Sequence, residues 1–204
     1  MLSVYSLKPK FQEVLRPVVR TVASAGITAN QITVTTCLLS IVLGIFLTLN
    51  AQNPRWFLLL PEFFFIRMAF NAIDGMLARE FHQKSNLGAY LNELSDVISD
   101  AFLYLPFAYV RGFDPLSMGA VIVLSVTSEL AGTIAPMTGA TRRCDGPMGK
   151  SDRALVFGAL AFWLGAGLEV ASWASTVFPV LVSFLLALTI VNRVRNALAE
   201  VANP

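Results

Sequence analysis

Charged residues are scarce in this chain of 204 residues: only 14% are Asp, Glu, Lys or Arg, whereas 55% are hydrophobic. Soluble domains carry about 25% charged residues, so the composition predicts an integral membrane protein. One histidine and two separated cysteines exclude a zinc site and a disulfide framework. The net charge of +2 argues against binding to nucleic acid.

A cleavable signal peptide is not expected, because the first 30 residues contain several charges but no continuous apolar core. Residues 11–25 instead predict an amphipathic helix that lies in the membrane interface. Its apolar side holds Phe11, Val14, Leu15, Val18, Val19 and Val22, and its polar side holds Glu13, Arg16 and Arg20. A helix packed on the protein's own cytoplasmic face is the alternative.

Six apolar stretches follow, each long enough to cross a hydrocarbon core of about 30 Å as a helix. They are Ile32–Asn50, Trp56–Leu77, Gly88–Tyr109, Leu116–Pro136, Ala154–Val170 and Ala174–Val191. We therefore expect an all-α integral membrane protein with one domain over residues 1–204. Residues 1–30 would form the interfacial helix and a turn, and residues 31–196 a six-helix bundle.

The basic residues are distributed unequally between the predicted loops. Twelve fall on the side of the amino terminus: Lys8, Lys10, Arg16, Arg20, Arg79, Lys84, Arg142, Arg143, Lys150, Arg153, Arg193 and Arg195. The opposite side holds only Arg55 and Arg111, and Arg67 lies within the second span. Because cytoplasmic loops are enriched in Lys and Arg, both termini are expected in the cytoplasm. Arg67 and Glu129 of the fourth span are both charged residues within predicted spans, and we expect them to form an ion pair.

Two polar clusters interrupt the second and third spans. One contains Asn71 and Asp74, and the other contains Asn92, Asp96 and Asp100. Within a helix, the members of each cluster share a face, and carboxylates at membrane depth usually mark a functional site. If the two helices are neighbours, their oxygen atoms converge into a site that suits Mg²⁺ and substrate phosphates.

The spacing of this stretch closely resembles a family signature. It reads Asp74-Gly75-x-x-Ala78-Arg79, eight residues, Gly88, three residues, Asn92, three residues, Asp96. CDP-alcohol phosphotransferases carry D-G-x2-A-R-x8-G-x3-D-x3-D, usually with a further Asp three positions earlier. This chain departs from that pattern at two positions, where Asn71 and Asn92 replace Asp.

The resemblance implies a membrane enzyme that moves a phosphatidyl or phospho-alcohol group from a CDP-alcohol to a hydroxyl acceptor and releases CMP. CDP-diacylglycerol is the expected donor, and Mg²⁺ or Mn²⁺ the expected cofactor. Asp96 would be the general base. The implied metal ligands are Asn71, Asp74, Asn92 and Asp96, and the implied donor-binding residues are Asn30, Thr33, Gly75, Ala78, Arg79 and Gly88. Helix capping is an equal alternative for Asn30 and Thr33.

The two asparagines halve the charge of the predicted metal site. Four Asp residues would give −4, enough for two divalent ions, whereas Asp74 and Asp96 alone give −2. An asparagine carbonyl still coordinates Mg²⁺, but without charge. The site could therefore bind one ion or bind two ions weakly. Alternatively, Glu93 or Asp100 could supply the missing negative charge. Asp100 is therefore a further candidate ligand.

A basic segment precedes the fifth predicted span. Four cationic residues, Arg142, Arg143, Lys150 and Arg153, would bind the acceptor or a phosphate, because helix amino termini favour anions. The alternative is the ordinary excess of positive charge in a cytoplasmic loop, which attracts anionic headgroups.

The sequence therefore predicts a phosphatidyltransferase of phospholipid synthesis in the bacterial inner membrane, with its active site facing the cytoplasm. The resemblance also implies a homodimer. A non-catalytic protein that binds lipid or nucleotide is one alternative, since two Asp positions carry Asn. A small ion-coupled transporter is another, but such proteins usually contain inverted repeats, and no internal repeat is found in this sequence.

Overall fold

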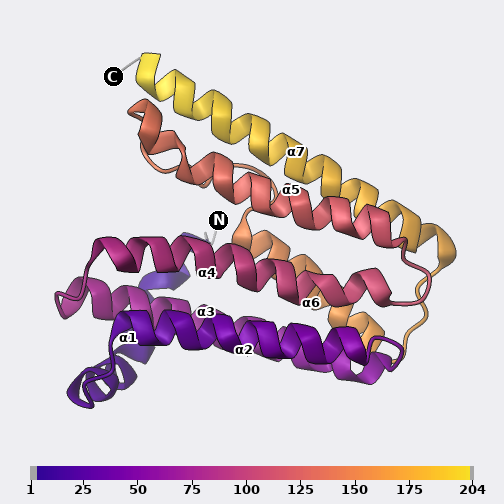
Figure 1. Cartoon of the computed structure of the whole chain (residues 1–204), viewed down its shortest axis with the longest axis horizontal. Coiled ribbons are helices and arrows are strands. Elements are labelled where there is room, and N and C mark those ends of the chain that lie inside the picture. Colours follow the sequence, from indigo (N-terminus) through magenta and orange to yellow (C-terminus); the bar gives the residue numbers. More distant parts are fainter. Residues whose placement is uncertain (1–3, 203–204) are drawn as a thin grey trace. The chain divides into compact units, whose positions relative to one another are not determined.

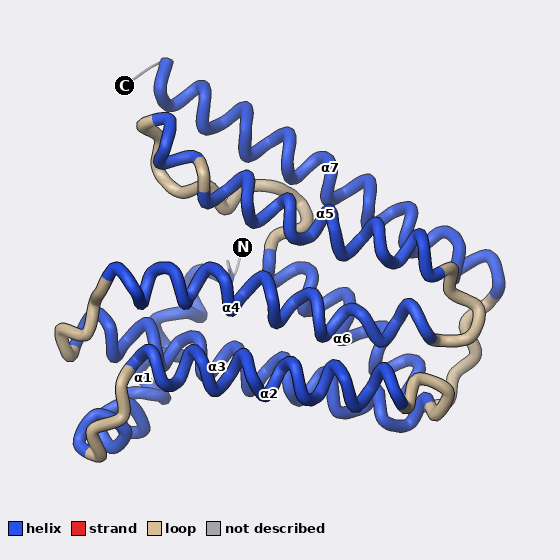
Figure 2. Tube along the Cα trace, viewed as in Figure 1, coloured by secondary structure: helices blue, strands red, loops and turns tan. Residues whose placement is uncertain are grey.

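The computed structural model describes residues 4–202, and every regular element among them is helical (Figures 1 and 2). The α-helices are α1 (Val4–Ser24), α2 (Ala29–Leu49), α3 (Leu59–Glu80), α4 (Asn86–Tyr104), α5 (Pro115–Thr133), α6 (Lys150–Gly165) and α7 (Ser172–Ala202). Three short 3₁₀ helices are η1 (Pro54–Leu58), η2 (Leu105–Tyr109) and η3 (Ala135–Thr138). The predicted all-α class is confirmed.

Four helical segments of the described chain are long and apolar enough to cross a membrane. They are Ala29–Leu49, Pro54–Glu80, Pro115–Thr138 and Ser172–Ala202, which correspond to the first, second, fourth and sixth predicted spans. The other two candidates differ for separate reasons. Helix α4 carries Glu93, Asp96 and Asp100, and α6 has 16 residues, which is about 24 Å at 1.5 Å per residue. The number six therefore stays a prediction.

The described chain divides into two compact units. The first contains residues up to Leu39 together with Phe63–Asp96, and the second contains Ser40–Glu62 together with residues from Val97 on. The first unit thus holds α1, the start of α2, most of α3 and the start of α4. The whole family-like signature lies in this unit.

Helix α1 packs on α3 through only part of its apolar side. Val19 is fully buried against Ile73, Met76 and Leu77. Val14 and Val18, by contrast, remain 74% and 46% exposed. One stripe of α1 therefore packs on the protein, while a second stripe stays exposed. The location of α1 in the membrane interface stays a prediction.

The second unit is built on the pair α5 and α7, which lie side by side (Figure 1). An aromatic cluster fills its interior: Tyr104 of α4 stacks on Phe157 of α6, with ring centroids 4.1 Å apart. Phe107 of η2 packs against Phe157 and against Phe57 of η1. These rings are fully buried, so they join α4, α6, η1 and η2 in one apolar core.

Side-chain caps fix where two helices of this unit begin. Asp114 accepts hydrogen bonds from the Ser117 backbone N–H at 2.8 Å and from its hydroxyl at 2.6 Å. The bond from the Ser117 hydroxyl is the main reason that the pKa of Asp114 lies below its usual value. At α6, Asp152 accepts from the Gly149 N–H at 3.0 Å, and its charge also suits the amino end of a helix.

Gly146 permits the loop before α6 to lie directly on α7. Its φ is +113°, and a Cβ atom there would lie 2.7 Å from the Thr189 Cα. Strain and steric overlap should therefore make Gly146→Ala destabilising by about 2 kcal/mol or more. Thermal unfolding in detergent measures this effect.

Gly119→Ala is the matched control, because Gly119 lies within α5 and a Cβ atom there meets nothing within 4 Å. Helix propensity should make this control neutral or stabilising by about 1 kcal/mol. Equal melting temperatures for the two variants would contradict the close packing of Gly146 on α7.

Candidate active site

The signature residues occupy both arms of one antiparallel helical hairpin. Asn71, Asp74, Gly75, Ala78 and Arg79 lie on α3, whereas Gly88, Asn92 and Asp96 lie on α4. Residues 81–85 form the short connection between them. Because a helix turns every 3.6 residues, the spacing of the motif places Asn71 with Asp74, and Gly88 with Asn92 and Asp96, on one face of each helix.

Asp74 is held by the first turns of α2. Its side chain is buried, and its Oδ2 atom accepts a hydrogen bond from the Thr33 hydroxyl at 2.8 Å. Thr33 Oγ1 also lies 3.1 Å from the Ala29 carbonyl oxygen, one turn earlier in α2. The structure therefore brings together Thr33 and Asp74, two residues that sequence analysis assigned to the same site from distant parts of the chain.

The glycines of the motif permit close approach of polar side chains. A Cβ atom at Gly88 would lie 2.9 Å from Asn30 Oδ1, so the Asn30 side chain rests against the α4 backbone. At Gly75, a Cβ atom would lie 3.2 Å from an Arg79 guanidinium nitrogen, so that side chain folds back over its own helix. Small residues thus make room here for hydrogen-bonding groups.

Arg67 contacts Asp96, while Glu129, the partner expected from the sequence, binds Arg153 and Arg193. Its Nη2 atom donates to the Asp96 carbonyl oxygen at 3.1 Å and lies 3.5 Å from Asp96 Oδ1. The side chain of Arg67 is 5% exposed and that of Asp96 is 20% exposed. A buried cation therefore lies beside the predicted general base.

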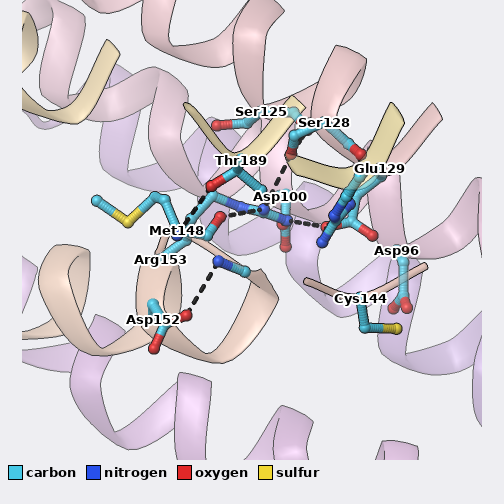
Figure 3. Close-up of polar contacts among 12 residues, drawn as sticks. Asp96, Asp100, Ser125, Ser128, Glu129, Cys144, Met148, Asp152, Arg153 and Thr189 are labelled. Atoms are coloured by element: carbon cyan, nitrogen blue, oxygen red, sulfur yellow. Dashed lines mark hydrogen bonds and ion pairs between the residues drawn. The ribbon is translucent and has the colours of Figure 1, made fainter. Parts of the chain in front are cut away.

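Glu129 and Asp100 belong to a buried ion cluster in the second unit (Figure 3). Arg153 is the centre of this cluster: one guanidinium nitrogen lies 2.7 Å from Asp100 Oδ2 and 2.9 Å from Glu129 Oε1. The other nitrogen donates to the Met148 carbonyl oxygen at 3.2 Å and to the Ser128 hydroxyl at 3.3 Å. Arg153 is completely buried, so these contacts replace the hydration of its two terminal nitrogens, whereas its Nε atom has no hydrogen-bond partner among the described residues.

Arg193 of α7 adds a second cation to the same cluster. It donates to the Ser128 carbonyl oxygen and, at 3.2 Å, to that of Asp145, and it lies 3.5 Å from Glu129 Oε1. From the sequence, Arg193 is expected only as one of the cytoplasmic positive charges, without a partner in the fold. A signal was present, because a buried Glu129 within apolar α5 requires a cation, and α7 offers one.

Arg143 is also engaged by the protein. It binds Asp145 through two nitrogens at 2.7 and 3.0 Å, and Glu200 of α7 at 2.8 Å. The bonds from Arg143 are the main reason that the pKa of Asp145 lies below its usual value. This arrangement holds the loop before α6 against the end of α7.

The four basic residues predicted for the acceptor therefore divide into two pairs. Arg143 and Arg153 are committed to carboxylates of the chain itself. Arg142 has a side chain that is 43% exposed, 4.0 Å from Glu129 Oε2, and Lys150 is partly exposed at the start of α6. Arg153 is therefore enclosed by the protein, whereas Arg142 is the most exposed of these three arginines.

The residues of the hairpin fit a hard divalent cation by their chemistry. Asp74 and Asp96 supply carboxylate oxygens, and Asn71 and Asn92 supply amide oxygens, which Mg²⁺ and Mn²⁺ accept. Within residues 4–202, no group of three or more His, Cys, Asp or Glu residues that could hold a metal ion is found. The amide oxygens of Asn71 and Asn92 would therefore have to complete a metal site in this hairpin.

Comparison with known families decides the assignment. The sequence model described as CDP-alcohol phosphatidyltransferase matches residues 26–191. The chain belongs to the CDP-alcohol phosphatidyltransferase family. The matched segment includes every signature residue as well as the basic loop before α6, so the family assignment extends well beyond the hairpin.

Two curated relatives support this membership. The inner membrane protein YnbA of Escherichia coli strain K12 is 42% identical over 201 residues, which is 97% of each chain. The archaetidylinositol phosphate synthase of Pyrococcus horikoshii is 30% identical over 102 residues, or 50% of this chain and 52% of that protein. The first relative extends the similarity to nearly the full length.

Solved structures show that the fold is shared as well. The phosphatidylinositol phosphate synthase PgsA1 of Mycobacterium tuberculosis with CDP-DAG bound has a TM-score of 0.75 at 19% identity, covering 94% of both chains. The same enzyme in complex with manganese and citrate has a TM-score of 0.73 at 20% identity, covering 92% of this chain and 88% of that one. The helical architecture of the family is thus preserved at low sequence identity.

Proposed function

We propose that this protein transfers a phosphatidyl group from CDP-diacylglycerol to a hydroxyl acceptor, with release of CMP, at the cytoplasmic face of the membrane. Family membership supports phosphatidyl transfer in phospholipid synthesis. The observation that carries the assignment to this chain is the intact hairpin, in which Asp74 is anchored by Thr33 and Asp96 by Arg67.

The proposed chemistry is a displacement at phosphorus. The acceptor oxygen forms a bond to the phosphorus that carries diacylglycerol, and the bond from that phosphorus to the bridging oxygen breaks. CMP leaves with the electron pair, and Asp96 takes the hydroxyl proton. A divalent cation held by Asp74, Asn71 and Asn92 would neutralise charge on the diphosphate.

The remaining residues would position the donor and acceptor. Asn30, Gly75, Ala78, Arg79 and Gly88 line the same hairpin and are proposed to contact the donor, with Gly75 and Gly88 allowing close approach. Arg142 and Lys150 are proposed to meet the acceptor or a phosphate, because the Arg142 side chain is 43% exposed and Lys150 lies partly exposed at the amino end of α6, which favours anions. We propose that Asp100 supports the fold instead of binding the metal, because its carboxylate is bound by Arg153 at 2.7 Å.

The direct test uses the purified full-length protein in detergent or vesicles. CDP-diacylglycerol, Mg²⁺ or Mn²⁺ and a panel of alcohols, both free and phosphorylated, are incubated with it, and the products are identified by mass. We expect CMP together with one new phosphatidyl product, and loss of both on chelation of the metal. Binding of CDP-diacylglycerol without release of CMP would instead identify a non-catalytic homologue.

A homodimer is also proposed, by analogy with the family. Chemical crosslinking in native membranes, followed by mass measurement of the purified complex, tests this proposal independently of activity.

A further inference from the structure

Arg67 places a permanent positive charge beside the candidate metal site. It is the one basic residue that the sequence locates within a predicted span rather than in a loop. Burying a guanidinium is costly unless it is paired, and a charge at membrane depth usually serves a function. Its contacts with the carbonyl and carboxylate oxygens of Asp96 therefore indicate a role for Arg67 at this site.

The contact between Arg67 and Asp96 also indicates the register of the hairpin. Helices α3 and α4 run antiparallel, so each step of four residues up one helix matches a step of four down the other. From the contact of Arg67 with Asp96, we expect Asn71 to lie opposite Asn92 one turn toward the connecting loop. Arg67 thus closes the end of a polar row that farther along contains Asp74.

The charge of this row differs from that of a carboxylate cage. Asp74 and Asp96 contribute −2, Arg67 contributes +1, and Asn71 and Asn92 contribute nothing, so the formal charge of these five side chains is −1. A row of four carboxylates without the arginine would carry −4. Coulomb's law makes such differences large where water is scarce, so the row is suited to one divalent ion only.

We propose that Arg67 is a built-in cation that stands in for a second metal ion and holds the Asp96 carboxylate in position. The chain then binds a single divalent ion near Asp74, Asn71 and Asn92. Arg67 is a positioning residue and does not itself contact the reacting atoms. This inference rests on the proposed function for the location of the metal, but its test does not depend on turnover.

The test is a titration with Mn²⁺, followed by electron paramagnetic resonance, of the full-length protein in detergent with CMP present. Wild type should bind one Mn²⁺. Arg67→Gln should bind it about tenfold more tightly, because removal of a nearby positive charge favours a cation. Arg67→Lys, which retains the charge, should match wild type within about threefold. Arg111→Gln, an exposed residue in the turn before α5, controls for a change of net charge alone.

A double variant provides a second readout. In Asn71→Asp/Asn92→Asp, which keeps Arg67, we expect one Mn²⁺ ion to bind more tightly than in wild type. Adding Arg67→Gln to this double variant should allow a second Mn²⁺ ion to bind. If Arg67→Gln fails to fold, as judged by size-exclusion chromatography, the double variant still decides the question. Two ions bound by wild type, or by the double variant, would overturn the proposal, as would equal Mn²⁺ affinities for Arg67→Gln and wild type.

This experiment is separable from the test of activity. If the wild-type protein releases CMP and Arg67→Gln leaves the Mn²⁺ affinity unchanged, the proposed role of Arg67 is refuted but the proposed function is not. Absence of CMP release from CDP-diacylglycerol would refute the proposed function, while the Mn²⁺ titration would still report on the charge of the hairpin.

Discussion

Asp74→Asn should reduce the rate of CMP release from CDP-diacylglycerol by about 10³-fold, since metal stabilisation of developing charge contributes several kcal/mol. Asparagine has the same shape and can still accept the hydrogen bond that Thr33 donates at 2.8 Å. The substitution therefore removes the charge of a metal ligand while leaving its position unchanged. Rates are measured at saturating metal and again over a metal titration, because lower affinity should appear as a higher metal requirement.

Glu62→Gln is the matched control for this prediction. Glu62 is an exposed carboxylate in the first turn of the same helix, α3, so the chemical change is identical. Its activity should stay within about twofold of wild type, as expected of exposed positions away from a site. If Asp74→Asn were as active as Glu62→Gln, the hairpin would not be the catalytic centre.

Arg153→Met should cost about 3–5 kcal/mol of stability, because it removes the buried cation that binds both Asp100 and Glu129. Arg153 is completely buried, and its contacts with these carboxylates are 2.7 and 2.9 Å long. For a chain of this length the loss corresponds to about 10 °C in melting temperature. Unfolding in detergent, followed by tryptophan fluorescence, measures the change.

Recovery by a neutral partner distinguishes a charge effect from a packing effect. Adding Asp100→Asn to Arg153→Met should restore part of the melting temperature, because the carboxylate that has lost Arg153 is then neutral, while Glu129 keeps its contact with Arg193. Arg55→Met, at an exposed position in η1, should change it by no more than about 1 °C. An unaltered melting temperature for Arg153→Met would mean that the cluster does not stabilise the fold.

The hairpin could be predicted from the sequence because its residues lie close together in the chain. The spacing of Asp74, Gly75 and Arg79, and of Gly88, Asn92 and Asp96, follows the period of a helix, which needs no tertiary contact to be read. The link from Thr33 to Asp74 was indicated only by resemblance, since 41 residues separate them. No local rule predicts that contact.

The ion cluster could not be predicted from the sequence, because its residues lie far apart in the chain. Arg153 lies 53 residues from Asp100 and 24 from Glu129 in the sequence. Apolar patterns show which residues face inward, but they do not specify the axial register of two packed helices. Arg153 was consequently interpreted as a ligand for the acceptor, and Glu129 as the partner of Arg67. The structure gives both residues other contacts.

The extent of the folding unit differs from the extent of the family match. The match ends at residue 191, yet Arg193 contacts Glu129 and Glu200 contacts Arg143. A protein shortened to the matched residues would keep the hairpin but lose these two ion pairs between α7 and the rest of the second unit. Expression of such a fragment should therefore yield an unstable protein, and the boundary for engineering lies beyond residue 200.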